Sequence, residues 1–234
     1  MELKEVDLPR ELKRIKDIGW VKSLRKSDTG IGKTIETLLD IPENNDGEPD
    51  CLYNGQEVEI KGHRSNSNSM ITLFTLEPET KKLKDVELMK KYGYINGNGR
   101  RALKITLRSD DYVTQGLKIK TDRERNTISI VDRESNEPWI WNKADIHPKV
   151  HNICLIYSES RKSDGVEEFR LDSAELLSGL DDNCFFELIE KGIIKIDLRM
   201  HIKSSGGPRN HGTGFRILDR ESLFKCYKIR EKIL

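Results

Sequence analysis

Hydrophobic and polar residues alternate most regularly in the last quarter of the chain. From Ile194 to Lys203, apolar side chains occupy every second position, and charged or polar side chains occupy the positions between them. This period of two is typical of a strand with one buried and one solvated face. Weaker alternation over 103–141 predicts a meander of short strands. Further strands are predicted over Met70–Leu76, Val150–Tyr157 and His211–Leu218.

Other segments carry the spacing of a helix. Apolar residues three and four positions apart predict helices over Leu8–Leu24 and, after a loop that begins at residue 28, through Ile31, Ile35 and Leu38. Leu83–Tyr92, Ser173–Lys191 and Arg220–Leu234 also predict helices. This mixture of helices and strands favours an α/β or α+β fold, and 234 residues suffice for one domain with two lobes.

A tight turn is predicted at Asn54-Gly55, because this dipeptide is the strongest short signal for a two-residue hairpin. Antiparallel pairing about that turn sets Cys51 opposite Val58 and Asp50 opposite Glu59. Directly opposed residues share one face of a sheet, with Cβ atoms about 4.5–5.5 Å apart. The hairpin is therefore expected to hold two carboxylates side by side.

Lys61 follows Glu59 by two positions and lies on the same face. Opposed carboxylates destabilise a sheet unless a cation lies between them, and their oxygens suit a hard ion such as Mg²⁺. An adjacent lysine suits a phosphate or a metal-bound water. Asp50, Glu59 and Lys61 thus predict a metal-dependent site that cleaves phosphodiesters, although their spacing alone favours an ordinary charged hairpin about equally.

Three nearby residues are weaker candidates. Glu36, in the predicted second helix, is either a solvated side chain or a third carboxylate near the metal. Lys33 lies in a glycine-rich helix start whose N–H groups suit a DNA phosphate. This start is no nucleotide-binding P-loop, because Ser27 stands where that motif needs glycine. His63 shares the face of Lys61 and is either structural or close to DNA.

A second group of candidates is basic. Its members are Arg199, Lys203, Arg209, His211 and Arg216. The simplest interpretation is the solvated side of a surface strand. Because arginine forks match the edges of guanine, the same density of Arg and His also suits a role in reading DNA bases.

Composition narrows these possibilities only slightly. The 41 basic and 40 acidic residues nearly balance, so affinity for DNA would come from local patches. Four cysteines without CxxC spacing argue against a structural zinc site and a disulfide framework, and they fit a reducing cytosol. No apolar run approaches the length of a membrane span, so we expect a cytoplasmic protein without membrane contact.

Several motifs occur in an order that resembles a known family. They are the segments 30–39, Pro49-Asp50, 59–63, 71–75 and 211–217. Together they look like the MvaI/BcnI type of restriction endonuclease, which is related to the mismatch-repair nickase MutH. The resemblance extends from Trp20 to Ile217, although the segment 76–157 contributes little to it.

The resemblance implies a PD-(D/E)xK nuclease fold, in which a mixed sheet is flanked by helices and two lobes surround a DNA cleft. We expect a catalytic lobe over roughly 1–110 and a DNA-recognition lobe over roughly 111–234. Mg²⁺ would be bound by Asp50 and Glu59, with Lys61 positioning or activating water and Glu36 as an acidic helix residue near the site.

The resemblance also implies a monomer that cuts double-stranded DNA one strand at a time, at short pseudo-palindromes of the CC-x-GG kind. The region around His211 and Arg216 matches the family's guanine-reading segment. Arg209 departs from the family, because MvaI and BcnI carry a histidine there. A companion DNA methyltransferase is a possible partner. The alternatives are a MutH-like nickase in repair and a DNA-binding module that has lost catalysis.

Overall fold

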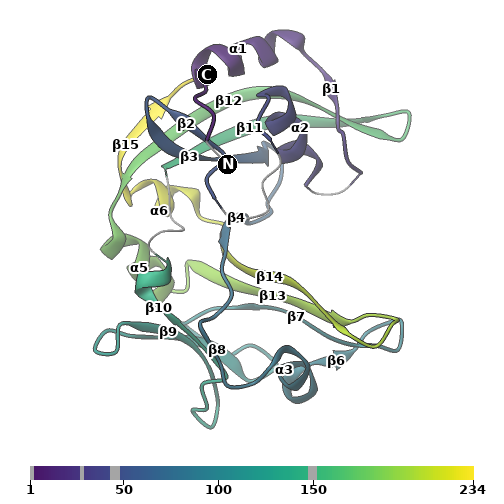
Figure 1. The fold of residues 1–234 in the computed structure, drawn as a ribbon, viewed down its shortest axis with the longest axis vertical. Helices are drawn as coiled ribbons and strands as arrows, with labels where there is room; N and C mark the ends of the chain where they lie inside the picture. Colours follow the sequence, from purple (N-terminus) through teal and green to yellow (C-terminus); the bar gives the residue numbers. More distant parts are fainter. Residues whose placement is uncertain (1–2, 27–28, 43–47, 147–151) are drawn as a thin grey trace. The chain divides into compact units, whose positions relative to one another are not determined.

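A computed structural model describes residues 3–26, 29–42, 48–146 and 152–234. The chain forms two compact units (Figure 1). Unit 1 comprises Met1–Ile71, His151–Asp181 and Phe224–Leu234, and unit 2 comprises Thr72–Val150 and Asp182–Leu223. The units therefore interleave along the sequence, whereas the expected lobes divided it near residue 110.

Unit 1 contains a six-stranded sheet in the order β1-β12-β11-β3-β2, with β15 also paired to β12. Strand β3 runs parallel to β11, and the other pairs are antiparallel, so the sheet is mixed. The strands are β1 (Val21–Lys22), β2 (Cys51–Tyr53), β3 (Gln56–Arg64), β11 (Asn152–Ser163), β12 (Val166–Leu180) and β15 (Tyr227–Lys232).

Two helices complete the core of unit 1. Helix α1 (Leu8–Ile18) contacts β12, and α2 (Gly30–Leu38) contacts β3. Buried Leu12 and Ile15 from α1 join Ile31 and Ile35 from α2 in one cluster with apolar residues of the sheet. The two elements approach closely at Gly62, where an added Cβ atom would lie 2.9 Å from Cγ2 of Ile31. This glycine lets α2 lie against the strand that carries the candidate site.

Unit 2 contains two sheets, in the orders β4-β14-β13-β7-β6 and β5-β10-β9-β8. The first comprises β4 (Ile71–Thr75), β6 (Tyr94–Ile95), β7 (Arg101–Leu107), β13 (Ile194–Ile202) and β14 (Pro208–Ile217). The second comprises β5 (Thr80–Lys81), β8 (Leu117–Asp122), β9 (Thr127–Asp132) and β10 (Trp139–Asn142). Buried Trp141 of β10 packs edge-on against Phe215 of β14, with ring centroids 6.0 Å apart.

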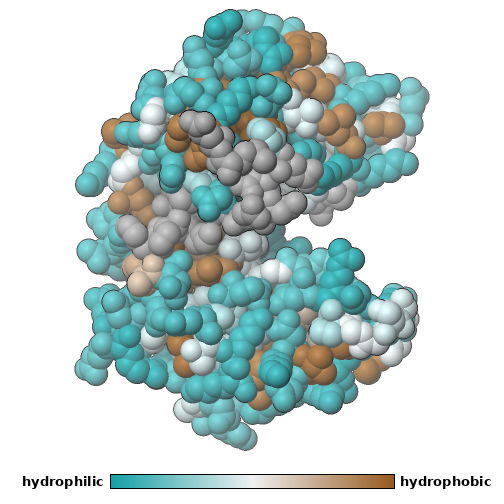
Figure 2. Space-filling view, in the orientation of Figure 1, coloured by the Kyte–Doolittle hydropathy of each residue, from teal (hydrophilic) through white to brown (hydrophobic). Residues whose placement is uncertain are grey.

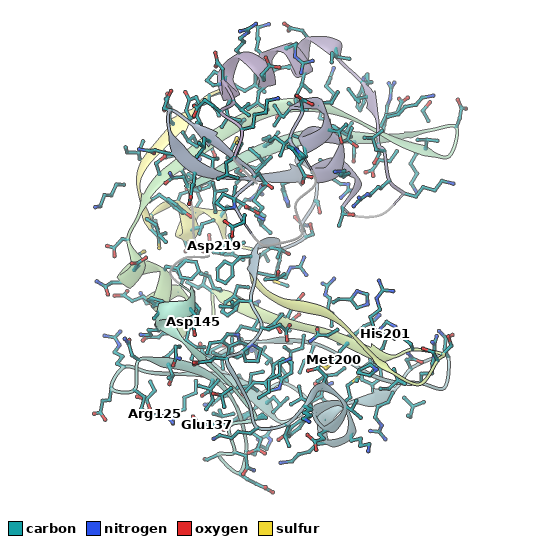
Figure 3. All side chains as sticks on the ribbon, in the orientation of Figure 1. Arg125, Glu137, Asp145, Met200, His201 and Asp219 are labelled. Atoms are coloured by element: carbon teal, nitrogen blue, oxygen red, sulfur yellow. The ribbon has the colours of Figure 1, made fainter. Side chains whose placement is uncertain are left out.

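The remaining helices are short: α3 (Asp85–Tyr92), α4 (Lys143–Ile146), α5 (Asp182–Glu190) and α6 (Arg220–Phe224). On the surface of unit 2, charged side chains pair with one another. Figure 3 labels Arg125 and Glu137, whose Nη2 and Oε1 atoms are 2.7 Å apart. The expectation of a mixed α+β fold with sheets flanked by helices is confirmed.

Three predicted helices are wrong in part. Helix α1 ends at Ile18, because Gly19 has φ of +81° and turns the chain into β1. The segment 173–180 is strand, since it pairs with β11 on one side and β15 on the other. The end of the chain also forms a strand after α6. In both of the last cases long-range pairing overrides local helical spacing.

The cysteines also differ from expectation. Cys51 and Cys154 are free and buried, whereas Cys184 and Cys226 are disulfide-bonded. The expectation of no disulfide framework is therefore wrong for Cys184 and Cys226. Among the described residues, no helix is long and apolar enough to cross a membrane.

Candidate functional site

The predicted hairpin is present with the predicted register. Cys51 pairs with Val58, Leu52 with Glu57 and Tyr53 with Gln56. Asn54 and Gly55 form the turn with φ of 52° and 72°. Positive φ at both central positions is the requirement of a type I′ turn, which asparagine and glycine tolerate best. Local sequence thus fixes the register of β2 against β3.

Asp50 lies immediately before β2 and forms two hydrogen bonds to the backbone of β3. Its N–H donates to the carbonyl oxygen of Val58 at 3.2 Å, and its Oδ2 accepts from the Ile60 N–H at 2.6 Å. On β3, Lys61 Nζ donates to Glu59 Oε1 at 2.5 Å. The side chains of Glu59 and Lys61 are 23% and 19% exposed, so solvent reaches both. The hairpin therefore brings Asp50, Glu59 and Lys61 together, as predicted.

The electrostatics of Asp50 are unusual for a carboxyl group. Burial, and next the negative charge of Glu59, raise the pKa of Asp50 to about 7. The charge of Glu36 acts in the same direction, while the Ile60 N–H and Lys61 act against it. A carboxylate with more negative than positive neighbours favours a cation beside it.

The donor set of this site fits a divalent cation. Asp50 and Glu59 supply carboxylate oxygens, which are the ligands that Mg²⁺ prefers, and Mg²⁺ commonly keeps several waters and uses one or two carboxylates. In the described part of the chain, no cluster of three or more His, Cys, Asp or Glu side chains is arranged to hold a metal ion. The fit to a divalent cation thus rests on the carboxylate oxygens of Asp50 and Glu59.

Helix α2 brings two further candidates to this side of unit 1. Glu36 Oε2 lies 3.9 Å from Lys33 Nζ, and the two side chains are 25% and 17% exposed. Helix α2 contacts β3, and the negative charge of Glu36 also raises the pKa of Asp50. Glu36 is thus near the carboxylate pair, and Lys33 is held next to Glu36.

His63 is placed differently from the other candidates. The residue is 6% exposed, its Nε2 lies 3.2 Å from the carbonyl oxygen of Ser67, and its ring meets Tyr157 edge-on with centroids 6.3 Å apart. These contacts fix the turn that follows β3. His63 is thus buried and held by contacts with the turn and with Tyr157.

In unit 2, the strand β13 has the predicted two faces. Met200 is fully buried, and its neighbour His201 is partly exposed; both are labelled in Figure 3. His201 lies opposite Arg209 of β14, and Arg199 lies opposite Lys104 of β7. The ring of His211 lies 5.4 Å from that of His201. Figure 2 shows a mostly hydrophilic surface on the visible face of unit 2.

These cations influence one another. Burial, followed by the positive charges of Arg209, His201, Lys104 and Arg199, lowers the pKa of His211. Lys203 lies just beyond the end of β13 and is exposed. The structure therefore brings Arg199, Arg209 and His211 into one basic face of this sheet.

Sequence reasoning missed Asp197, which organises the basic face. Its side chain is 4% exposed, and its Oδ2 accepts from Arg216 Nη1 at 2.5 Å and Arg199 Nη2 at 2.9 Å. Thr106 Oγ1 donates to the other oxygen at 2.5 Å. The available signal was a single acidic residue among the basic positions of an alternating strand.

The comparisons with known proteins agree with this architecture. A model of the MvaI/BcnI restriction endonuclease family matches residues 10–224. A solved complex of restriction endonuclease MvaI with its cognate DNA substrate is 27% identical, with 97% of each chain covered and a TM-score of 0.84. Restriction endonuclease MvaI in the absence of DNA is 26% identical, with 97% of this chain and 96% of that chain covered and a TM-score of 0.56.

No curated protein matches the chain. The fold and the matches define the class of the protein as a restriction endonuclease of mixed α+β architecture. More narrowly, the chain belongs to the MvaI/BcnI restriction endonuclease family, which confirms the resemblance seen in the sequence.

Proposed function

We propose that the protein is a type II restriction endonuclease that hydrolyses double-stranded DNA with Mg²⁺ as cofactor. The observation that carries this proposal is the grouping of Asp50, Glu59 and Lys61 on one hairpin, with the pKa of Asp50 raised by burial and by Glu59. Family membership supports it, and so does the likeness to the MvaI–DNA complex.

Each residue of this group has a distinct task. Asp50 and Glu59 would hold the cation, which when bound polarises the scissile phosphate and lowers the pKa of a coordinated water. Asp50 keeps its orientation because the Ile60 N–H donates to Oδ2. Lys61 Nζ is held by Glu59 and carries three donors, so it can stabilise charge that develops on the phosphoryl oxygens. Glu36 adds negative charge beside the pair.

The basic face of unit 2 is the proposed reader of the DNA sequence. Arg199 and Arg216 are oriented by Asp197, so their guanidinium planes are fixed before any ligand arrives. Guanidinium groups match the O6 and N7 atoms of guanine, which suits a CC-x-GG-like pseudo-palindrome. Arg209 and His211 extend this surface. Lys203 and Lys33 are proposed to contact phosphates, and His63 to support the catalytic strand.

We further propose that the enzyme acts as a monomer, cuts one strand at a time and works in the cytoplasm. A cell that makes such an enzyme must protect its own sites, so a companion DNA methyltransferase is expected. A MutH-like nickase and an inactive DNA-binding module are the other candidates. Family membership favours the restriction enzyme over the nickase, and the intact Asp50–Glu59–Lys61 group argues against the inactive module.

One experiment tests the proposal directly. The full chain is incubated with long DNA of known sequence and Mg²⁺, and the new ends are mapped by sequencing. The expected result is one recurring short motif with a constant cut position, and a nicked intermediate that appears before linear product on a one-site plasmid. Ends without a common motif, or no cleavage with Mg²⁺ or Mn²⁺, would contradict the proposal.

A further inference from the structure

The β13–β14 pair is irregular at the centre of the basic face. Thr213 lies opposite Leu198 and Asn210 lies opposite Met200, so His211 and Gly212 share the space opposite Arg199 alone. Gly212 has φ of +86°, a backbone conformation that favours glycine. A bulge of this kind bends its strand and redirects the side chains within it. The direction of His211 therefore depends on what holds the bulge.

Both the oxygen and the nitrogen of the Asn210 side-chain amide form hydrogen bonds that hold the bulge. Its Oδ1 accepts from the Gly212 N–H at 3.0 Å, inside the bulge. Its Nδ2 donates to Glu77 Oε2 at 3.2 Å and to Asp85 Oδ2 at 3.2 Å. The amide thus ties the bulged backbone to two acidic residues in other parts of unit 2.

The two acidic residues are themselves fixed. Lys81 Nζ donates to Glu77 Oε2 at 2.6 Å and to Asp85 Oδ1 at 3.0 Å. Thr213 Oγ1, just beyond the bulge, donates to Glu77 Oε1 at 3.2 Å. Glu77 therefore accepts from residues on both sides of His211 and Gly212. We name Glu77, Lys81, Asp85 and Asn210 the amide clamp.

The neighbours of His211 explain why a clamp is needed. His201 is 5.4 Å away from ring to ring, and Arg209 stands opposite His201. The positive charge of Arg209 therefore lies next to this pair of rings, and a glycine-containing bulge resists displacement only weakly, because glycine is conformationally permissive. A neutral amide that is hydrogen-bonded at both ends can fix the backbone without adding another cation.

We propose that the amide clamp is a specificity-determining positioning device: Asn210 and Glu77 fix the bulge and thereby aim Arg209 and His211 at the bases of the DNA. This inference rests on the proposed function. The clamp acts through Arg209 and His211 and does not touch the reacting phosphate. Its loss should therefore reduce sequence discrimination more than the rate of strand cleavage.

The test compares Asn210→Ala, Asn210→Asp and Glu77→Gln with the unaltered enzyme. Three quantities are measured: the ratio of cleavage rates on the mapped sequence and on single-base variants, the single-turnover rate on saturating mapped sequence, and the melting temperature. Asn210→Ala is expected to lower discrimination by about tenfold, which is comparable to the effect of one mismatched base pair in a recognition site. The saturated single-turnover rate should stay within about twofold, because the clamp lies outside the Asp50–Glu59–Lys61 group.

A rescue separates positioning from general stability. Asn210→Asp places a third carboxylate beside Glu77 and Asp85, so discrimination should fall further. In the double variant Asn210→Asp/Glu77→Gln the donor and acceptor exchange places, which restores the link to residue 77 but not the link to Asp85, so discrimination should recover in part. Glu187→Gln removes one partner of an ion pair with Lys191, an exposed pair elsewhere in unit 2, and should change nothing.

The outcomes distinguish the two proposals. An unaltered enzyme that cleaves no DNA contradicts the proposed function, and the clamp is then judged by discrimination in DNA binding with Ca²⁺. An active enzyme whose Asn210→Ala variant keeps full discrimination overturns the clamp alone. A variant that loses melting temperature and discrimination together, with no recovery in the double variant, also overturns it.

Discussion

The acidic hairpin of unit 1 (Asp50, Glu59 and Lys61) and the basic face of unit 2 (Arg199, Arg209 and His211) differ in how their charges are neutralised. In unit 1, Glu59 accepts a hydrogen bond from Lys61, and burial together with the charge of Glu59 raises the pKa of Asp50 to about 7. In unit 2, one buried carboxylate, Asp197, accepts from both Arg199 and Arg216. The acidic hairpin has more negative than positive charge, whereas the basic face includes a carboxylate, Asp197, that neutralises part of its positive charge.

This difference indicates what each region is prepared to bind. A carboxylate pair whose proton affinity is raised lacks only a cation to become fully charged. An arginine pair that is already fixed by hydrogen bonds loses little conformational entropy when it meets a ligand. Each of the following changes alters one side of this comparison, and the largest expected effect comes first.

Removal of either charge that we propose to be catalytic should abolish cleavage. Lys61→Ala and Asp50→Ala are each expected to lower the single-turnover rate by at least ~10²–10³-fold, because each removes charge stabilisation that the reaction needs. DNA affinity in Ca²⁺ should stay largely intact, since the basic face is unchanged. Gel-shift titration and timed cleavage measure the two quantities separately.

Asp17→Ala is a matched control, because it removes a surface carboxylate that is paired with Lys13 on α1. It should leave both quantities unchanged. Full cleavage activity in the Asp50→Ala variant would remove the proposed mechanism.

Removal of the counter-charge in unit 2 should weaken both folding and binding. Asp197→Ala leaves Arg216, which is only 16% exposed, next to Arg199 without their shared carboxylate. Breaking a buried pair from one side costs about 3–5 kcal/mol of the free energy of unfolding. Urea denaturation measures this cost, and Asp197→Asn, which keeps the shape, should lose less. Equal stability of all three proteins would show that Asp197 does not hold the arginines.

The approach of α2 to the acidic hairpin can be tested at Gly62. Gly62→Ala places a methyl group 2.9 Å from Ile31 Cγ2 and should destabilise the protein by ~1–3 kcal/mol through overpacking. Because α2 carries Glu36, cleavage should also slow. Gly97→Ala is the matched control, since an added Cβ there meets nothing within 4 Å. Thermal unfolding of both variants would show whether the close contact matters.

The raised pKa of Asp50 makes the metal-free protein less stable at neutral pH. The folded state holds the Asp50 proton up to about pH 7, whereas the unfolded chain releases it near 3.8. Stability from this group is thus present below about pH 4 and is lost as the pH rises toward 7. Asp50→Asn should therefore stabilise the metal-free protein by ~3–4 kcal/mol at pH 7.5 and by less than ~1 kcal/mol at pH 4.

Chemical denaturation with EDTA at the two pH values checks this pattern. Mg²⁺ should raise the stability of the unaltered protein and have a smaller effect on Asp50→Asn, because only the former offers two carboxylates. A stability difference that is the same at both pH values would contradict the assigned cause.

The sequence determined the parts of this protein that depend on local interactions. Asn54-Gly55 fixed the hairpin register, since few residues tolerate positive φ at both central turn positions, and that register placed Asp50 near Glu59 and Lys61. Alternation of apolar and polar residues determined the two faces of β13, because successive side chains of a strand point to opposite sides.

Only the tertiary structure decided the features that depend on distant partners. The segment 173–180 has helical spacing but becomes strand, because β11 and β15 supply its hydrogen bonds. His63 contacts Tyr157, which lies far along the chain. Asp197 became the centre of the basic face through its contact with Arg216 on the neighbouring strand. The sum of many such long-range contacts exceeds the small local preferences, and no short window of sequence contains them.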